Sequence, residues 1–393
     1  MRNFAAHGVV FQALLWLLLV TIAPHYAQAD IPVPPTTAKR IYLQDLSTGR
    51  VLLAKQAYER FQPGPLSLLM TLYVVFDLVE HKNLKMEESL QVSQHVADFT
   101  GQEMNLQKEE LVTVEDLVKG IAIGQAVDAA MVLEEKMPKI QDSLVNLMTF
   151  NLKNMNLKDS QFSSGLGINT PYTYVTASDM AVIAERLINN YPQYYRYFSL
   201  KDFDHNLLSF TNKNSLLFFT KDIDGLMAGI NGEGEAQAVI SAKIGNRRLM
   251  LVISGGNDLN KTLQEAKSLI HWGFRNFKNY TLFKPGFNLG DVPIWQGNSS
   301  SIYAMIAQNV SATMSGDERQ ALKATLTIDS PIAAPIEAGQ IIGTLNFSST
   351  PEMPIFNIPV KASISVQKQR LIPRALNNLA LLLSGQAHFE NTP

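Results

Sequence analysis

The stretch FQPGPLSLLMTLYVV, residues 61–75, places a proline-rich turn directly before an unbroken apolar run. Proline is favoured at the first helical position, so this stretch predicts the entry to a buried helix. Ser67 lies where a nucleophile could be carried, but the residue three positions later is Met70. The next lysines, Lys82 and Lys85, lie beyond the apolar run. We therefore interpret Ser67 as a hydroxyl that bonds the preceding turn.

The sequence around this helix combines strand and helix signals. Two apolar runs flank Ser-Thr-Gly-Arg at 47–50, which predicts a β-hairpin over 41–53. Apolar periodicity and cap residues predict helices over 66–79, 114–137 (one or two helices), 176–192 and 263–277, and strands over 236–242 and 248–254. Helices and an antiparallel sheet in one domain define the α+β fold class.

The chain changes character after Tyr280. Residues 281–366 form short alternating segments with turn residues between them, and helix signals are almost absent. This pattern predicts a first domain over residues 30–280 and a second, all-β domain over 281–366.

The first 29 residues have the pattern of a signal peptide. Arg2 precedes a short apolar core, VVFQALLWLLLVTI, and Ala-Gln-Ala at 27–29 is a small-x-small cleavage site. We expect a periplasmic protein whose mature chain starts near Asp30; an uncleaved anchor is the alternative. The absence of cysteine fits an exported protein stabilised by its core alone.

The last segment, residues 367–393, contains the apolar stretch LIPRALNNLALLLSG at 371–385. On a helix, its leucines share one face and Asn377 and Asn378 lie opposite. Two interpretations stay open. The segment is either an amphipathic helix on the surface of the inner membrane, or it has no membrane role and is a helix docked on the β domain or a frayed tail.

Composition and motifs exclude several functions. With 33 basic against 35 acidic side chains, the formal net charge is -2, and nothing favours nucleic acid as a partner. No cysteine is present and no H-E-x-x-H occurs, so neither a metal site nor a cofactor is expected. The glycine-rich GINGEGEA, residues 229–236, lacks a phosphate-loop lysine and is expected to lead into the next strand.

Several blocks, in this order and spacing, resemble one family. They are YLQDLSTGRVLLAKQAYERFQP at 42–63, PYTYVTASDMAVIAERLI at 171–188, NKNSLL at 212–217, LMLVISGG at 249–256, EAKSLIHWGFRNF at 265–277 and PIEAGQIIGTLNF at 335–347. The chain resembles the low-molecular-mass penicillin-binding proteins, the serine D-alanyl-D-alanine carboxypeptidases of the bacterial cell wall. This resemblance implies a transpeptidase or β-lactamase-like domain, an antiparallel sheet flanked by helices, followed by a β-rich domain and an amphipathic anchor.

The family's chemistry needs three motifs, S-x-x-K, S-x-N and K-T-G. In them a lysine activates the serine nucleophile, and the strand-edge motif binds the substrate's terminal carboxylate. Aligned by the neighbouring blocks, the corresponding positions in this chain are Pro65 and Leu68 for the first motif, Gln125, Ala126 and Val127 for the second, and Met227, Ala228 and Gly229 for the third. Only the glycine is kept, so no catalytic residue is predicted.

Two functions remain open. The first is a non-catalytic relative that binds peptidoglycan or a cell-wall protein as a scaffold, through a cleft made apolar by Pro65, Leu68, Val127 and Met227. The second is a weakly active serine-type D-Ala-D-Ala carboxypeptidase with an unrecognised nucleophile.

Overall fold

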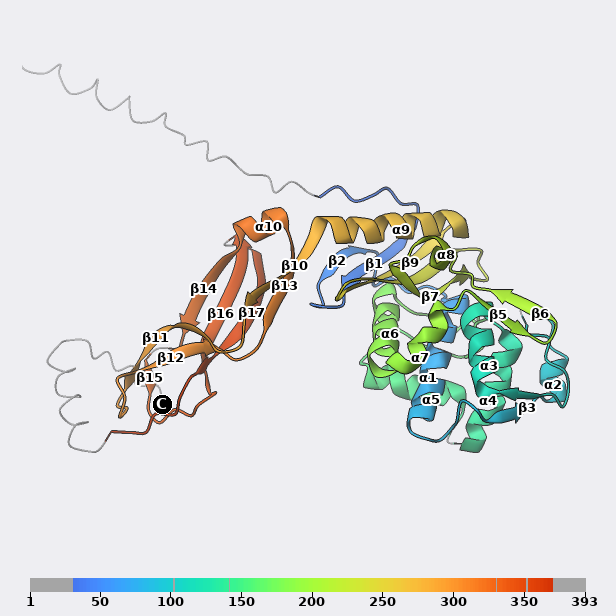
Figure 1. Ribbon diagram of the computed structural model, residues 1–393, viewed down its shortest axis with the longest axis horizontal. Helices are drawn as coiled ribbons and strands as arrows, with labels where there is room; N and C mark the ends of the chain where they lie inside the picture. Colours follow the sequence, from blue (N-terminus) through green and yellow to red (C-terminus); the bar gives the residue numbers. More distant parts are fainter. Residues whose placement is uncertain (1–30, 102, 141, 330, 351–352, 370–393) are drawn as a thin grey trace, which may run out of the picture. The chain divides into compact units, whose positions relative to one another are not determined.

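The computed structural model describes residues 31–369 apart from 102, 141, 330 and 351–352 (Figure 1). The predicted signal peptide and the apolar stretch at 371–385 lie outside the described residues.

The first part of the chain is built on a five-stranded antiparallel sheet. Its order is β2 (Val51–Lys55), β1 (Arg40–Asp45), β9 (Arg247–Gly256), β8 (Ala236–Ile244) and β7 (Ile223–Ile230). The central strands β8 and β9 are buried along most of their length because helices cover both faces of the sheet. Helix α9 (Leu259–Asn276) lies on one face and α6 (Ala177–Asn190) on the other (Figure 1). Strand β7 is an edge of this sheet.

Helix α1 (Leu68–Glu80) is the centre of the helical core, since its residues from Leu68 to Phe76 are all buried. The other helices of this part are α2 (Gln94–Ala97), α3 (Val114–Lys119), α4 (Val127–Ile140), α5 (Leu144–Asn154), α7 (Pro192–Tyr195) and α8 (Leu216–Phe219). Two small antiparallel sheets of two strands each pair β3 (Ser89–Gln91) with β4 (Leu111–Thr113) and β5 (Asp202–His205) with β6 (Leu208–Thr211).

The predicted elements are present, with boundaries that local chemistry explains. The hairpin, both strands and the helices at 176–192 and 263–277 are confirmed. Helix α1 starts at Leu68 because residues Gly64–Ser67 form a tighter 3-10 turn, η1. Helix α9 starts at Leu259, earlier than predicted, because the side chain of Asp258 accepts a hydrogen bond from the Lys261 N–H and caps it.

The region 114–137 forms two helices. A π-helical turn, η2 (Gly120–Gly124), follows α3, and Gln125 then adopts a left-handed conformation with φ 57°. A non-glycine residue rarely takes this conformation, and here it separates η2 from α4. The position of Gln125 therefore follows from a break in the helix that apolar periodicity alone does not reveal.

Strands dominate from Phe277 onward. The larger sheet has the order β14 (Lys323–Ile328), β16 (Ile341–Thr350), β17 (Met353–Ala362), β12 (Ser301–Ile306), β11 (Phe287–Trp295) and β15 (Ile332–Ala333), while β10 (Phe277–Phe283) pairs with β13 (Val310–Ser315). Ile306, Phe347 and Val360 are among its buried core residues. Because α9 ends at Asn276 and β10 begins at Phe277, helix gives way to strand just before the predicted boundary at 280/281, which stays a prediction.

The β-rich region also contains a short helix that was not predicted, α10 (Gly316–Ala321). Ser315 and Glu318 form a capping box, in which each side chain accepts a hydrogen bond from the other's backbone N–H. The S-x-x-E spacing that signals this box is present in the sequence.

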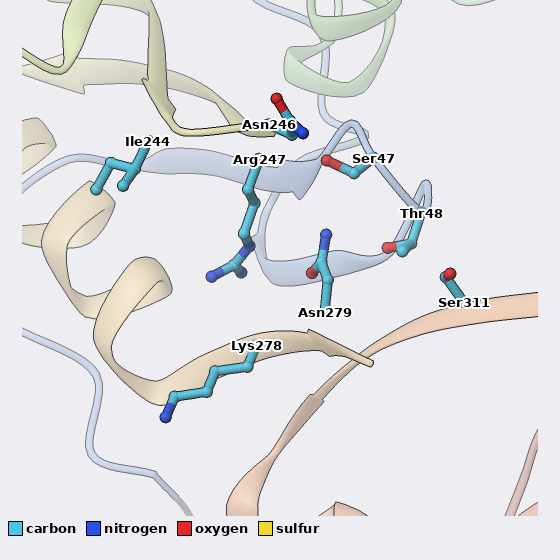
Figure 2. Close-up of a pocket in the computed structure, with 8 residues that line it drawn as sticks. All are labelled: Ser47, Thr48, Ile244, Asn246, Arg247, Lys278, Asn279 and Ser311. Atoms are coloured by element: carbon cyan, nitrogen blue, oxygen red, sulfur yellow. The ribbon is translucent and has the colours of Figure 1, made fainter. Parts of the chain in front are cut away.

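The turn between β1 and β2 packs against β13 and α10. Arg50 makes two hydrogen bonds to the Glu318 carboxylate, at 2.5 and 2.8 Å, and a third to the Thr313 carbonyl at 2.6 Å. A pocket of about 470 Å³ lies beside this turn (Figure 2). Its lining residues are Ser47, Thr48, Ile244, Asn246, Arg247, Lys278, Asn279 and Ser311.

Candidate functional site

The three segments predicted to hold a former active site meet beside strand β7. Pro65 lies in η1, Gln125 follows η2, and Gly229 lies near the end of β7. A β-carbon built on Gly229 would be 3.1 Å from Gln125 Oε1 and 3.2 Å from Pro65 Cγ. These three positions, far apart in the sequence, are therefore in direct contact.

Gln125 connects the end of η2 to strand β7. Its left-handed backbone ends the π turn, and its side chain reaches strand β7, where Nε2 donates a hydrogen bond to the Ala228 carbonyl at 2.6 Å. The Gln125 side chain is 4% exposed. The amide thus fills the space between η1 and β7.

The remaining predicted positions belong to the core. Leu68 is 1% exposed, Val127 6%, Met227 1% and Ala228 0%. A β-carbon on Gly167 would lie 2.8 Å from the Leu68 side chain, so Leu68 packs directly beneath that loop. The expected apolar cleft lined by Pro65, Leu68, Val127 and Met227 is therefore wrong: three of these side chains point into the core, and only Pro65 is partly exposed.

The hydroxyl of Ser67 is engaged in the turn, as predicted. Ser67 is fully buried, and its Oγ donates a hydrogen bond to the Gly64 carbonyl at 2.8 Å. Pro65 has no backbone N–H, so it cannot donate to a ligand's carbonyl oxygen. Neither a hydroxyl nor an amine is found among the seven predicted positions, Pro65, Leu68, Gln125, Val127, Met227, Ala228 and Gly229.

Side-chain amides fix the turn that carries Pro65. Asn231 Nδ2 donates to the Gln62 carbonyl at 2.9 Å, and Gln237 Nε2 donates to the Pro63 carbonyl at 2.5 Å. Asn169 Nδ2 donates to Gln62 Oε1. Sequence analysis missed these amides because each bond joins residues that are more than a hundred positions apart, and isolated Asn and Gln residues give no local signal.

Glycine at position 64 is required by the same packing. Gly64 has φ 47°, and a β-carbon there would lie 2.9 Å from Asn231 Cα. Asn231 Oδ1 also accepts from the backbone N–H groups of Glu233 and Glu235. The predicted loop is confirmed over residues 231–235 and leads into β8, whereas Gly229 and Ile230 still belong to β7.

The charged groups at the other end of β7 have structural partners. Asp224 accepts from Arg248 Nη1 at 2.8 Å and from the Tyr195 hydroxyl at 3.0 Å. Burial raises the pKa of Tyr195, which keeps the hydroxyl protonated as a donor. This network anchors β7 and leaves no free base on it for chemistry.

The described part of the chain has neither a cluster of metal ligands nor a helix suited to span a membrane. Residues 31–369, with the gaps given above, contain no group of three His, Cys, Asp or Glu side chains placed to hold a metal ion. Within the same residues, no helix combines the length and apolar character needed to cross a membrane.

Comparison with known proteins identifies the family. Residues 27–258 match the family described as D-alanyl-D-alanine carboxypeptidase, and residues 277–368 match the C-terminal domain of penicillin-binding protein 5. The chain belongs to the D-alanyl-D-alanine carboxypeptidase family. The predicted resemblance to the low-molecular-mass penicillin-binding proteins is confirmed.

Two relatives of this carboxypeptidase family align over most of the chain. D-alanyl-D-alanine carboxypeptidase DacC of Escherichia coli (strain K12) is 29% identical over 341 residues, 84% of this chain and 85% of the relative. DacF of Bacillus subtilis (strain 168) is 26% identical over 373 residues, 91% of this chain and 94% of the relative.

The solved structure of penicillin binding protein 5 from Haemophilus influenzae is similar, with a TM-score of 0.76 and 25% identity over 86% of this chain and 100% of that chain. The expected fold, an α+β penicillin-binding domain followed by an all-β domain, is confirmed.

Proposed function

We propose that this protein is a non-catalytic member of the D-alanyl-D-alanine carboxypeptidase family that binds peptidoglycan, or holds a cell-wall protein, as a periplasmic scaffold. The relatives are named for activity on D-alanyl-D-alanine, which places the family's chemistry in the bacterial cell wall. The chain keeps the fold of this family and lacks the groups that perform its reaction.

The contact of Pro65, Gln125 and Gly229 carries this proposal. At the position of the nucleophile, Pro65 offers neither a hydroxyl nor a backbone N–H. In triad enzymes, loss of the nucleophile costs roughly a millionfold in turnover. Loss of one oxyanion donor costs about 3 kcal/mol of transition-state stabilisation. Acyl transfer at this place is therefore not expected.

The Gln125 amide supports the same conclusion from the side of binding. A peptide that paired with β7 at Ala228 would have to displace Gln125 from the Ala228 carbonyl. That carbonyl is buried, so losing its partner would cost about 1–3 kcal/mol. The scaffold function therefore uses a surface other than the former active site.

Export and attachment are part of the proposal. The signal pattern at 1–29 supports secretion into the periplasm, and the leucine face at 371–385 supports peripheral attachment to the inner membrane.

The test combines binding and activity. The purified mature protein is sedimented with insoluble peptidoglycan sacculi, and release of D-alanine from a pentapeptide substrate is measured in parallel. We expect co-sedimentation without D-alanine release. Catalytic release would instead establish the alternative, a weakly active carboxypeptidase with an unrecognised nucleophile.

A further inference from the structure

A pocket of about 740 Å³ lies between helix α5 and the segment that follows it. Ligand pockets are typically about 300–1,000 Å³, so this volume is adequate for a small ligand. Helix α5 contributes one face, with Val145, Thr149, Leu152 and Lys153 at helical spacing. The facing wall consists of Asn156, Leu157, Lys158, Ser160, Gln161, Phe162, Ser163 and Tyr174.

The pocket has an apolar floor and a polar rim. Leu152 and Phe162 are 4% and 2% exposed, whereas Lys153, Lys158 and Gln161 are exposed to solvent. The facing wall is held in place because Gln161 and Tyr174 exchange backbone hydrogen bonds at 2.8 and 2.9 Å. A fixed apolar floor beneath donor groups suits a ligand with both apolar and anionic parts.

The charge of this pocket is not neutralised. None of its lining residues is acidic, and the side-chain amines of Lys153 and Lys158 have no ion-pair or hydrogen-bond partner among the described residues. Neighbouring carboxylates are occupied: Asp159 pairs with Arg60 at 2.9 Å, and Asp179 accepts from Ser160 Oγ at 2.7 Å. Two lysines thus present positive charge at the rim.

Three other pockets differ in this respect. The pocket with Lys82 and Lys85 also contains Glu87 and Glu115, and the pocket with Lys108 and Lys139 also contains Glu109 and Glu135. The pocket beside the β1–β2 turn (Figure 2) likewise has no acidic lining residue, but its Arg247 is occupied by Asp45 at 2.6 Å and by the Phe277 carbonyl at 2.6 Å. Lys278 is then its one lining cation without a side-chain partner among the described residues, against two in the pocket beside α5. Of these four pockets, the one beside α5 is therefore the best suited to bind an anionic ligand.

We propose that the pocket between α5 and residues 156–163 binds an acidic peptide. The ligand's carboxylates would pair with Lys153 and Lys158, its small apolar side chains would contact Leu152 and Phe162, and its peptide carbonyls would accept from Gln161. The choice of peptide rests on the proposed function: the short, carboxylate-bearing peptides of peptidoglycan have this chemistry.

The experiment is a calorimetric titration of the mature protein with a soluble muropeptide that carries a pentapeptide. We expect binding at low salt that weakens as sodium chloride is raised, because exposed charge pairs are screened. The double variant Lys153→Glu, Lys158→Glu should bind about tenfold more weakly or worse. Lys139→Glu is the matched control, since Lys139 is also an exposed lysine in the last turn of a helix, α4.

A second variant tests the cavity without changing charge. Thr149→Trp should fill the space above the floor and abolish binding, while thermal unfolding checks that each variant is folded. The pocket proposal would be overturned if the wild-type protein showed no binding of the muropeptide, or if the double variant bound it as tightly as wild type. Sedimentation with sacculi distinguishes the pocket proposal from the scaffold function. If the double variant still binds sacculi as well as wild type, the scaffold function holds but this pocket takes no part in it.

Discussion

The side-chain amide of Gln125 donates a hydrogen bond to the carbonyl of Ala228 at 2.6 Å, and both residues are buried. This bond joins the break after the π turn to the edge strand β7. It joins the two segments that the family resemblance predicts for the second and third catalytic motifs. The Ala228 carbonyl on this edge strand therefore already has a partner within the protein.

Two substitutions of Gln125 separate the stability that its side-chain hydrogen bond contributes from the strain of its left-handed backbone conformation. Gln125→Ala and Gln125→Gly both remove the donor and leave the Ala228 carbonyl unpaired, which should lower the free energy of unfolding by about 1–3 kcal/mol. Glycine tolerates φ 57° whereas alanine does not, so Gln125→Gly should be more stable than Gln125→Ala by about 1 kcal/mol. Urea denaturation measures both values, and two variants as stable as wild type would show that the bond contributes nothing.

The purified protein should form no covalent adduct with penicillin. Acylation by a β-lactam needs the same serine, base and oxyanion donors as peptide cleavage. The contact of Pro65 with Gln125 and Gly229 offers neither the serine nor the base, and Pro65 has no backbone N–H to donate. Pro65→Ser alone should not restore reaction, since the new hydroxyl would have Leu68 in place of a base. Intact mass spectrometry after incubation decides the matter, and a stoichiometric adduct on any serine of the wild-type protein would reject the non-catalytic function.

Rebuilding the site should damage the fold before it restores activity. In the variant Pro65→Ser, Leu68→Lys, Met227→Lys, both lysines replace side chains that are 1% exposed. Burying an unpaired ammonium group costs several kcal/mol, so the triple variant should unfold at a markedly lower temperature than wild type. Calorimetry of Pro65→Ser and the triple variant side by side gives the comparison. A triple variant with wild-type stability and slow acylation by penicillin would mean that the backbone kept an open catalytic geometry.

Membrane attachment through residues 371–385 is tested by truncation. Burying Leu376, Leu379, Leu382 and Leu383 would contribute roughly 1.5 to 3 kcal/mol each as an upper bound, enough for reversible attachment. A chain ending at Gln369 should therefore move from the membrane fraction to the soluble fraction. If both chains fractionate identically, the anchor is wrong.

The sequence was sufficient for the fold because its signals are local. Apolar periodicity, the cap at Thr176 and the turn at 47–50 predicted α1, α3, α4, α6, α9, the strands β8 and β9 and the first hairpin. Helix α5 and the shorter elements of the first domain were not predicted. The family resemblance supplied the positions Pro65, Gln125 and Gly229, which the structure brings together.

Whether the former site is an open cleft or part of the packed core could not be predicted from local sequence signals. Whether Leu68 and Met227 line a cleft or fill the core depends on how α1 and β7 pack, which is a long-range property. The Gln125 hydrogen bond likewise joins residues 103 positions apart, so no local pattern signals it. Burial is decided by the partners that the tertiary fold supplies, and an apolar residue in a motif position gives no indication of them.

Arg50 and Glu318 should be energetically coupled. The pair is largely buried, with side chains 28% and 16% exposed, and its two parallel hydrogen bonds should give a coupling free energy of about 1–2 kcal/mol in a double-mutant cycle. Glu318→Ala should cost more than Arg50→Ala, because Glu318 Oε2 also accepts from the Ser315 N–H and caps α10. Glu318→Gln, which keeps the shape of the side chain, is the matched control.

The same pair should make stability depend on pH. Burial alone would raise the pKa of Glu318, but the hydrogen bonds from Arg50 and Ser315 outweigh it and lower the pKa below the ordinary value. For a carboxyl with a lowered pKa, the stabilisation is complete above the pKa of the unfolded chain, about 4.3, and is lost as the pH falls through the lower folded value. The difference in unfolding free energy between wild type and Glu318→Gln should therefore be constant from pH 8 to pH 5 and shrink as the solution is acidified toward pH 3. Urea denaturation of both proteins across this range measures it, and a difference that does not vary between pH 5 and pH 3 would show that Glu318 is not held as a carboxylate by Arg50.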